Sequence, residues 1–268
     1  MKKMLSLLLL LSLMISGANF YSCKKNANGR NTLSLVDDAT VMSLSTQEYA
    51  SFMSANPPVT GTPEADMVQR VGAKMTAAVA TYLAGKGQSD LIKDYQWEFN
   101  LVNNAEANAW CLPGGKIVVY TGIMSLISTD AELAAVVGHE ISHALLKHGS
   151  ERMSQQLLVE YGGVALSALL STKPAETSNL FKSAYGIGST LSVLAFSRSQ
   201  ESEADETGLY IMATGKYDPN SAVTFWQRMQ AQNTGTKPPV LLSTHPSDDQ
   251  RIENIKSLLP EAMKYYQP

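Results

Sequence analysis

The chain has 268 residues, of which 44% are hydrophobic and 17% charged, and its formal net charge is −3. This length and apolar content allow one substantial domain with its own hydrophobic core. The mild acidity, without any basic cluster, argues against nucleic acid as a partner.

The first 22 residues predict a secretory signal peptide. Lys2 and Lys3 precede an apolar stretch from Met4 to about Ile15, and small and polar residues follow. The apolar stretch is shorter than the roughly 20 residues that a membrane-spanning helix needs. We therefore expect the protein to be exported and exclude residues 1–22 from the fold.

The end of this segment resembles a bacterial lipobox. Residues 20–22 precede Cys23, although Phe20 stands where an aliphatic residue is usual. Lipidation of Cys23 would hold the protein at the periplasmic face of the bacterial outer membrane, with residues 23–40 as a flexible tether. The alternative is a soluble periplasmic protein with an ordinary thiol at Cys23. With Cys23 acylated, only Cys111 remains, so no intramolecular disulfide is expected.

Residues 41–268 predict a single α+β domain that is mainly helical. Apolar residues at helical spacing indicate a long amphipathic helix over residues 62–85. Alternating apolar residues predict a strand over 95–101, and residues 116–120 predict another. We expect these strands to form a small antiparallel sheet.

The second half of the sequence is predicted to be helical. Thr129 followed by Glu132 is a capping-box pattern that starts a helix, and Gly149 is a plausible end for it. The apolar stretches beyond it are short and interrupted by Gly and Ser, which favours a buried core over a membrane-facing hairpin. Further helices are expected over residues 152–170, 178–215 and 247–259 and from Asp218, with a loop over residues 233–244.

Residues 139–143 spell His-Glu-Ile-Ser-His inside the helix that starts at Thr129. Residues four apart in a helix share a face, so His139 and His143 can bind one metal ion, with Glu140 beside it. A solvated helix face can carry this pattern by accident. Here apolar residues surround the motif, and buried polar groups need partners such as a metal.

A catalytic zinc site needs a third protein ligand and an open position for water. Glu201 and Asp205 lie four apart on one predicted helix face, so Glu201 can bind the metal while Asp205 orients a histidine ligand. The alternative is a charged, solvated helix face, which Glu203 fits. His148 lies beyond His143 and is expected to point elsewhere, as a histidine at the helix end.

Several blocks of residues, taken in order, resemble metallopeptidase family 48 over about residues 45–260. The family groups HtpX-like, Oma-like and CAAX prenyl proteases with periplasmic and lipoprotein members such as BepA and LoiP. The blocks are Asn108-Ala109, Leu112–Ile117, His139–His143, Ser197-Arg198 with Glu201, Glu203, Ala204 and Asp205, and His245-Pro246 with Arg251 and Ile252.

The resemblance implies a zincin-like metalloprotease domain of the gluzincin type that binds one zinc ion. It assigns the third zinc ligand to Glu201 and a supporting role to Asp205. The transmembrane helices of the prenyl-protease and HtpX branches are missing from the sequence. This absence points to the periplasmic lipoprotein branch, and the resemblance implies protein quality control in the envelope.

The sequence therefore predicts a zinc-dependent metalloendopeptidase with Glu140 as the general base. His245 precedes Pro246 in a loop, and the matching block places it at the active site. It could donate to the oxyanion, or it could be a fourth ligand that keeps the enzyme latent. The alternative is a surface histidine.

The predicted strand over residues 116–120 is expected to offer an unpaired edge to which an extended peptide adds. Such main-chain recognition favours unfolded or misassembled proteins as substrates. A catalytically latent, chaperone-like protein that uses the same edge is the alternative function, whereas the distal pattern of thermolysin-type peptidases is absent. The candidate substrate-binding residues are Asn108, Gly114, Gly115, Lys116, Ile117 and Val118.

Overall fold

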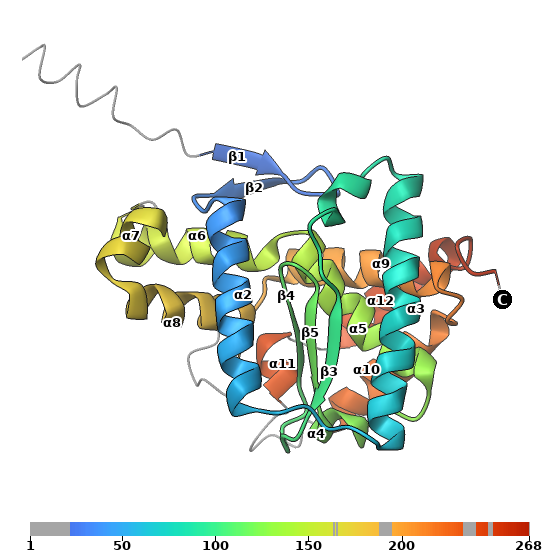
Figure 1. Cartoon of the computed structure of the whole chain (residues 1–268). Coiled ribbons are helices and arrows are strands. Elements are labelled where there is room, and N and C mark those ends of the chain that lie inside the picture. Colours follow the sequence, from blue (N-terminus) through green and yellow to red (C-terminus); the bar gives the residue numbers. More distant parts are fainter. Residues whose placement is uncertain are drawn as a thin grey trace, which may run out of the picture.

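The structure of the chain is a computed structural model (Figure 1). Most of its described residues lie in helices, as the sequence predicts. It describes residues 22–162, 164, 166–187, 195–232, 240–245 and 249–267, so nearly all of the predicted signal peptide lies outside it. No described helix combines the length and hydropathy needed to cross a bilayer. In chain order the elements are β1 (Ser22–Lys25), β2 (Asn31–Ser34), α2 (Asp38–Ala55), α3 (Pro63–Gly85), the 3₁₀ helix η1 (Ser89–Ile92), β3 (Glu98–Val102), β4 (Ala109–Leu112), β5 (Lys116–Tyr120), α4 (Thr121–Met124), α5 (Asp130–Leu145), α6 (His148–Tyr161), α7 (Leu166–Thr172), α8 (Pro174–Tyr185), α9 (Arg198–Thr214), α10 (Asn220–Ala231), α11 (Val240–Thr244) and α12 (Asp249–Ala262).

The central sheet is mixed rather than antiparallel, with strand order β3-β5-β4. β5 runs parallel to β3 and antiparallel to β4. Gly114 and Gly115 have φ of 87° and 80°, a conformation that glycine adopts readily, and they turn the chain from β4 directly back into β5. The expected unpaired edge at residues 116–120 is therefore wrong, because the turn places β5 in the centre. β4 forms one edge of the sheet.

Helices cover both faces of this sheet, which explains why β5 is buried along its whole length. On one face, Ile117 and Val119 belong to the core that α3, α5 and α9 share. On the other face, Val118 and Tyr120 pack in a second cluster with residues of α2, α6 and α8. Side chains alternate between the two faces of a strand, so the apolar run of β5 supplies both cores.

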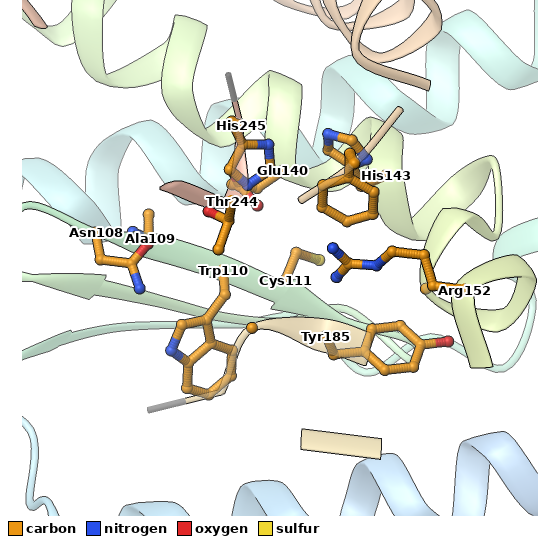
Figure 2. A pocket seen from close by; sticks show the side chains of 13 residues that line it. Asn108, Ala109, Trp110, Cys111, Glu140, His143, Arg152, Tyr185, Thr244 and His245 are labelled. Carbon is orange, nitrogen blue, oxygen red and sulfur yellow. Dashed lines mark hydrogen bonds and ion pairs between the residues drawn. The ribbon is translucent and has the colours of Figure 1, made fainter. Parts of the chain in front are cut away.

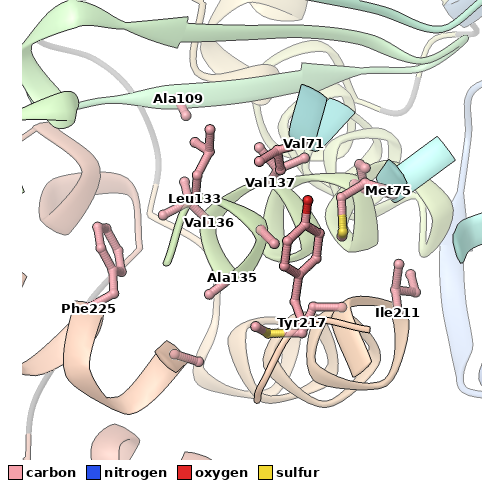
Figure 3. Packing of buried hydrophobic residues seen from close by; sticks show 14 of the residues in the cluster. Val71, Met75, Ala109, Leu133, Ala135, Val136, Val137, Ile211, Tyr217 and Phe225 are labelled. Carbon is pink, nitrogen blue, oxygen red and sulfur yellow. The ribbon is translucent and has the colours of Figure 1, made fainter. Parts of the chain in front are cut away.

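Helix α5 lies at the centre of the larger core (Figure 3). Every residue from Glu132 to Leu145 is buried, which is the state of a helix packed on all sides. Its first turn is capped as predicted by Thr129, whose side chain accepts from the Glu132 amide. The Glu132 carboxylate accepts from the amide of Ser128 at 2.6 Å. The metal-binding motif is thus held in the most enclosed helix of the domain.

Two glycines let α5 and α9 touch through their backbones. A Cβ atom on Gly138 would lie 3.0 Å from the Gly208 carbonyl oxygen, and one on Gly208 would lie 2.9 Å from the His139 amide nitrogen. Glu201 precedes Gly208 by about two helical turns. The contact between the glycines therefore fixes how closely the Glu201 side of α9 approaches the histidines of α5.

Several boundaries differ from the expected ones. α5 ends at Leu145 instead of near Gly149, because Lys147 adopts the left-handed conformation with φ of 59° and a new helix starts at His148. α11 lies within the expected loop over 233–244, whose residues 233–239 are outside the described part of the chain.

Residues 23–40, expected as a flexible tether, contain the β1–β2 hairpin and the first turn of α2. The Asn28-Gly29 pair in its turn is a common hairpin signal, and Gly29 has φ of 82°. The hairpin packs on α6 (Figure 1). The side chain of Cys23 is outside the described residues, so its lipidation stays a prediction.

The glycine contact can be tested with Gly208→Ala. The added methyl must push α9 away from α5, which we expect to cost about 1–3 kcal/mol of folding free energy and to weaken metal binding. Urea unfolding and a metal competition titration measure the two effects. Gly85→Ala is the matched control, because a Cβ there meets no atom within 4 Å. Unchanged stability and metal affinity in Gly208→Ala would contradict the assignment.

Candidate active site

Four buried side chains from three parts of the chain converge in one cluster: His139 and His143 of α5, Glu201 of α9, and His245, which follows α11. Their candidate ligand atoms all lie within 4.8 Å of one another. His139 Nε2 is 3.0 Å from His143 Nε2 and 3.1 Å from His245 Nδ1. His245 Nδ1 is 2.9 Å from Glu201 Oε1. Glu201 points into the cluster, and His245 is buried rather than on the surface.

The cluster fits a tetrahedral metal ion. Zinc lies about 2.0–2.2 Å from nitrogen and oxygen ligands, so neighbouring ligand atoms around it are roughly 3.3 Å apart. Five of the separations between atoms of these side chains run from 2.9 Å, between His245 Nδ1 and Glu201 Oε1, to 3.5 Å, between His139 Nε2 and Glu201 Oε2. Imidazole with carboxylate is also a donor set that zinc accepts. The residues present therefore suit such an ion.

Charges in the cluster also favour a cation. Burial disfavours the ionised form of Glu201, but Arg251 and the imidazoles outweigh it and hold its pKa well below its usual range. Burial alone would lower the pKa of His139, yet Glu201 and Asp205 raise it. The site therefore attracts positive charge, which a divalent ion would supply.

Asp205 lies behind His139, on the side away from the cluster. Its Oδ1 accepts from His139 Nδ1 at 2.9 Å, which leaves Nε2 of the imidazole to face the other ligand atoms. This is the arrangement that the four-residue spacing of Glu201 and Asp205 predicts. The edge-on packing of Trp226 against the His139 ring further restricts its orientation.

Glu140 lines a pocket together with His143 and His245 of the cluster (Figure 2). Its Oε1 is buried, has no hydrogen-bond partner among the described residues and lies 3.5 Å from His245 Nε2. Burial raises the pKa of Glu140, which makes its carboxylate a better base. Edge strand β4 forms one wall of this pocket through Ala109, Trp110 and Cys111.

Sequence comparison agrees with this geometry: residues 69–259 match the model of peptidase family M48. The chain belongs to this family. It is 35% identical over 181 residues to the mitochondrial metalloendopeptidase OMA1 of Schizosaccharomyces pombe, which covers 67% of this chain and 50% of that protein. It is 27% identical over 165 residues to the beta-barrel assembly-enhancing protease of Escherichia coli, covering 60% and 34%. The chain thus spans half or less of the length of both relatives.

Residues 69–259 place the chain in family M48, and its relative from Schizosaccharomyces pombe is named as a metalloendopeptidase. The predicted family is confirmed, and the grouping of His139, His143, Glu201 and His245 fits the predicted zincin-like site. The structure also shows which side chains surround this M48 site and which expected ones lie elsewhere.

The expectation that His148 points away from the site is wrong. Its Nδ1 lies 2.8 Å from His143 Nδ1, and its Nε2 lies 3.0 Å from Glu203 Oε2. The left-handed turn at Lys147 ends α5 and returns the chain toward His143, which an uninterrupted helix would not do. Glu203 is correspondingly only partly exposed and binds other side chains, unlike a fully solvated residue.

Arg251 of α12 is a site residue that spacing arguments did not assign. Its guanidinium binds both oxygens of Asp205, at 2.8 Å and 2.9 Å, and lies 2.8 Å from Glu201 Oε2. It also stacks on Trp226. The one signal for it in the sequence is its place in the block that begins at His245. Its charge offsets two carboxylates that would otherwise be buried together.

The expected substrate-binding residues are divided by the fold. Asn108 lines the pocket beside Glu140. Gly114 and Gly115 instead form the β4–β5 turn, and residues 116–118 lie in the central strand, hydrogen-bonded on both sides. The sequence placed the unpaired edge one strand too late, because it did not show that β5 would insert between β3 and β4.

Replacing Arg251 tests the charge balance of the site. We expect Arg251→Met to destabilise the metal-free protein by about 3–5 kcal/mol, because it leaves buried carboxylates without their cation. Arg70→Met breaks a more exposed pair with Asp130, whose side chains are 56% and 32% exposed, and should change the stability far less, because solvent screens this pair. Denaturant unfolding compares the two. Equal effects would show that Arg251 is not needed for charge balance.

Proposed function

We propose that this member of family M48 is a zinc metalloendopeptidase that cleaves unfolded or misassembled proteins in the bacterial envelope. The convergence of two imidazoles and a carboxylate beside a buried glutamate carries the proposal. The predicted signal peptide favours export, which agrees with the relative named for beta-barrel assembly rather than with the relatives named as mitochondrial. Lipidation of Cys23 would supply the membrane attachment.

His139, His143 and Glu201 would hold the zinc, and Glu140 would act as the general base. Bound zinc would supply Lewis acidity that lowers the pKa of water and polarises the substrate carbonyl. Glu140 accepts a proton from the attacking water and passes it to the leaving amine. Its burial suits this role, because a carboxylate with a raised pKa holds the proton between the two transfers.

The outer edge of β4 would align the substrate. The carbonyl of Asn108 accepts from the Tyr120 amide at 3.1 Å, so in this antiparallel pair residues 108, 110 and 112 bond toward β5. The main-chain groups of Ala109 and Cys111 therefore point outward, along the pocket that contains Glu140. A peptide that adds there as a strand would be held by its backbone, which requires an extended rather than a folded substrate.

We further propose that the arrangement described here is the latent one. The four donors match the four positions of a tetrahedral ion, so His245 at the fourth position would exclude the catalytic water. The side chains are also enclosed: His139, Glu140, His143, Glu201 and His245 are at most 4% exposed. A polypeptide can reach them only after His245 and the surrounding chain move.

Glu140→Gln tests the mechanism. The glutamine cannot accept the proton, but the ligands stay in place, so we expect near-complete loss of casein cleavage with one zinc still bound per chain. Metal analysis and a chelator-reversible cleavage assay measure both. Glu160→Gln on the exposed face of α6 is the control. Near wild-type turnover of Glu140→Gln would rule out the general base.

The same pair of proteins separates the proposed enzyme from the chaperone-like alternative. An enzyme gives cleavage that Glu140→Gln abolishes. A catalytically idle binding protein retains unfolded casein equally in both forms and cleaves it in neither.

His245→Ala tests the latent state. If His245 occupies the fourth position, removing its imidazole should raise basal proteolysis several-fold while the other three ligands retain the zinc. Thr244→Ser, which leaves the histidine unchanged, is the control. A lower kcat with unchanged zinc affinity would instead assign His245 to oxyanion stabilisation.

A further inference from the structure

A continuous set of polar contacts joins the β1–β2 hairpin to the metal ligand His143. Arg30, just before β2, contacts both Glu151 oxygens at 2.7 Å and 3.0 Å and Glu203 Oε1 at 2.7 Å. Glu203 Oε2 lies 3.0 Å from His148 Nε2. His148 Nδ1 in turn lies 2.8 Å from His143 Nδ1. The hairpin thus reaches the ligand through two intermediate side chains.

These contacts fix which nitrogen of His143 faces the metal. A carboxylate only accepts hydrogen bonds, so His148 Nε2 donates to Glu203. His143 Nε2 faces the cluster, so a metal bound there takes the lone pair of Nε2 and leaves the proton of His143 on Nδ1, which donates to His148 Nδ1. This tautomer leaves the lone pair of His143 on Nε2, which lies 3.4 Å from Glu201 Oε1 and 3.0 Å from His139 Nε2.

The hairpin is built to hold Glu203 in this position. Asn26 donates from Nδ2 to Glu203 Oε2 at 3.1 Å, and its Oδ1 accepts from the Arg30 amide at 3.0 Å. Asn28 adds a bond to Thr207, one turn further along α9. One short turn therefore binds α9 at two points and α6 at Glu151.

The two histidine ligands are supported in different ways. His139 is oriented by Asp205, which lies within the region that matches family M48, residues 69–259. His143 is supported by His148 and Glu203, which also lie within residues 69–259. The third member of its support, Arg30, precedes this matched region. The N-terminal segment thus adds a support of its own to the shared site.

We propose that the β1–β2 hairpin is a positioning part of the active site, in which Arg30, acting through Glu203 and His148, orients His143 for the metal. The proposal rests on the proposed zinc site, since His143 must be a ligand for its orientation to matter. It predicts that changes in the hairpin alter metal affinity although none of the hairpin side chains that the structure describes contacts the cluster.

A double-mutant cycle on zinc affinity tests this proposal. Loss of a hydrogen-bonding partner behind a ligand typically weakens metal binding 10–100-fold, and we expect this range for His148→Ala and a loss of several-fold for Arg30→Ala. His148→Asn places an amide oxygen near the former Nδ1 and should restore much of the affinity. The His148→Asn variant no longer has the contact between His148 Nε2 and Glu203. Adding Arg30→Ala to this variant should therefore cause no further loss of zinc affinity.

Lys25→Ala in the hairpin and Glu206→Ala on α9 are the matched controls, because neither side chain joins the set of contacts. If Arg30→Ala fails to fold, Arg30→Lys, which keeps the charge but not the two-sided contact, replaces it in the cycle. If Arg30→Ala lowers zinc affinity equally in the wild type and in the His148→Asn variant, the proposal is overturned. It is also overturned if Arg30→Ala lowers zinc affinity in neither protein.

Imidazole ¹⁵N NMR of the zinc-free protein provides a second measurement. We expect His143 to carry its proton on Nδ1 in the wild type and to become a mixture of tautomers in Arg30→Ala. A mixture already present in the wild type would overturn the proposal. Failure of the wild type to bind zinc would contradict the proposed function, whereas zinc binding that Arg30→Ala leaves unchanged would contradict only the role of the hairpin.

Discussion

The contact between Gly138 and Gly208 is the constraint on which the site depends. It brings the backbones of α5 and α9 so close that neither glycine has room for a Cβ atom without a shift, and Glu201 thereby meets the two histidines. Such closeness also buries two carboxylates in one small volume. The structure meets that cost with Arg251, which approaches from α12, so the packing of the last helix and the assembly of the metal site depend on each other.

Patterns within one element were sufficient for much of the fold and the site. The start of α5 at Thr129, the strand at 116–120 and the helix ending at Gly85 follow from capping chemistry, alternation and helical periodicity. The contact of Asp205 with one of the two histidines also follows, because residues four apart on α9 point the same way, whereas the choice of His139 required the structure. These features depend on short stretches of chain and little on the tertiary fold.

The features that escaped prediction depend on contacts between distant segments. Nothing in the local pattern of residues 116–120 distinguishes a central strand from an edge strand, since both can be apolar throughout. The position of His148 depended on one left-handed residue, Lys147, which is not a glycine and so gave no signal. Arg251 reaches the site from more than 40 residues beyond Asp205, a relation that only the tertiary structure reveals.

With a lipid on Cys23, the hairpin would also restrict where the enzyme can work. A tether spanning residues 23–40 would have allowed the active site to range roughly 60 Å from its anchor, at about 3.4 Å per extended residue. Because β1 already begins at Ser22, a lipid on Cys23 would leave almost no slack chain. The catalytic domain would then sit directly against the bilayer with a restricted orientation, and it would act on polypeptides that emerge at the membrane surface rather than on those that diffuse through the periplasm.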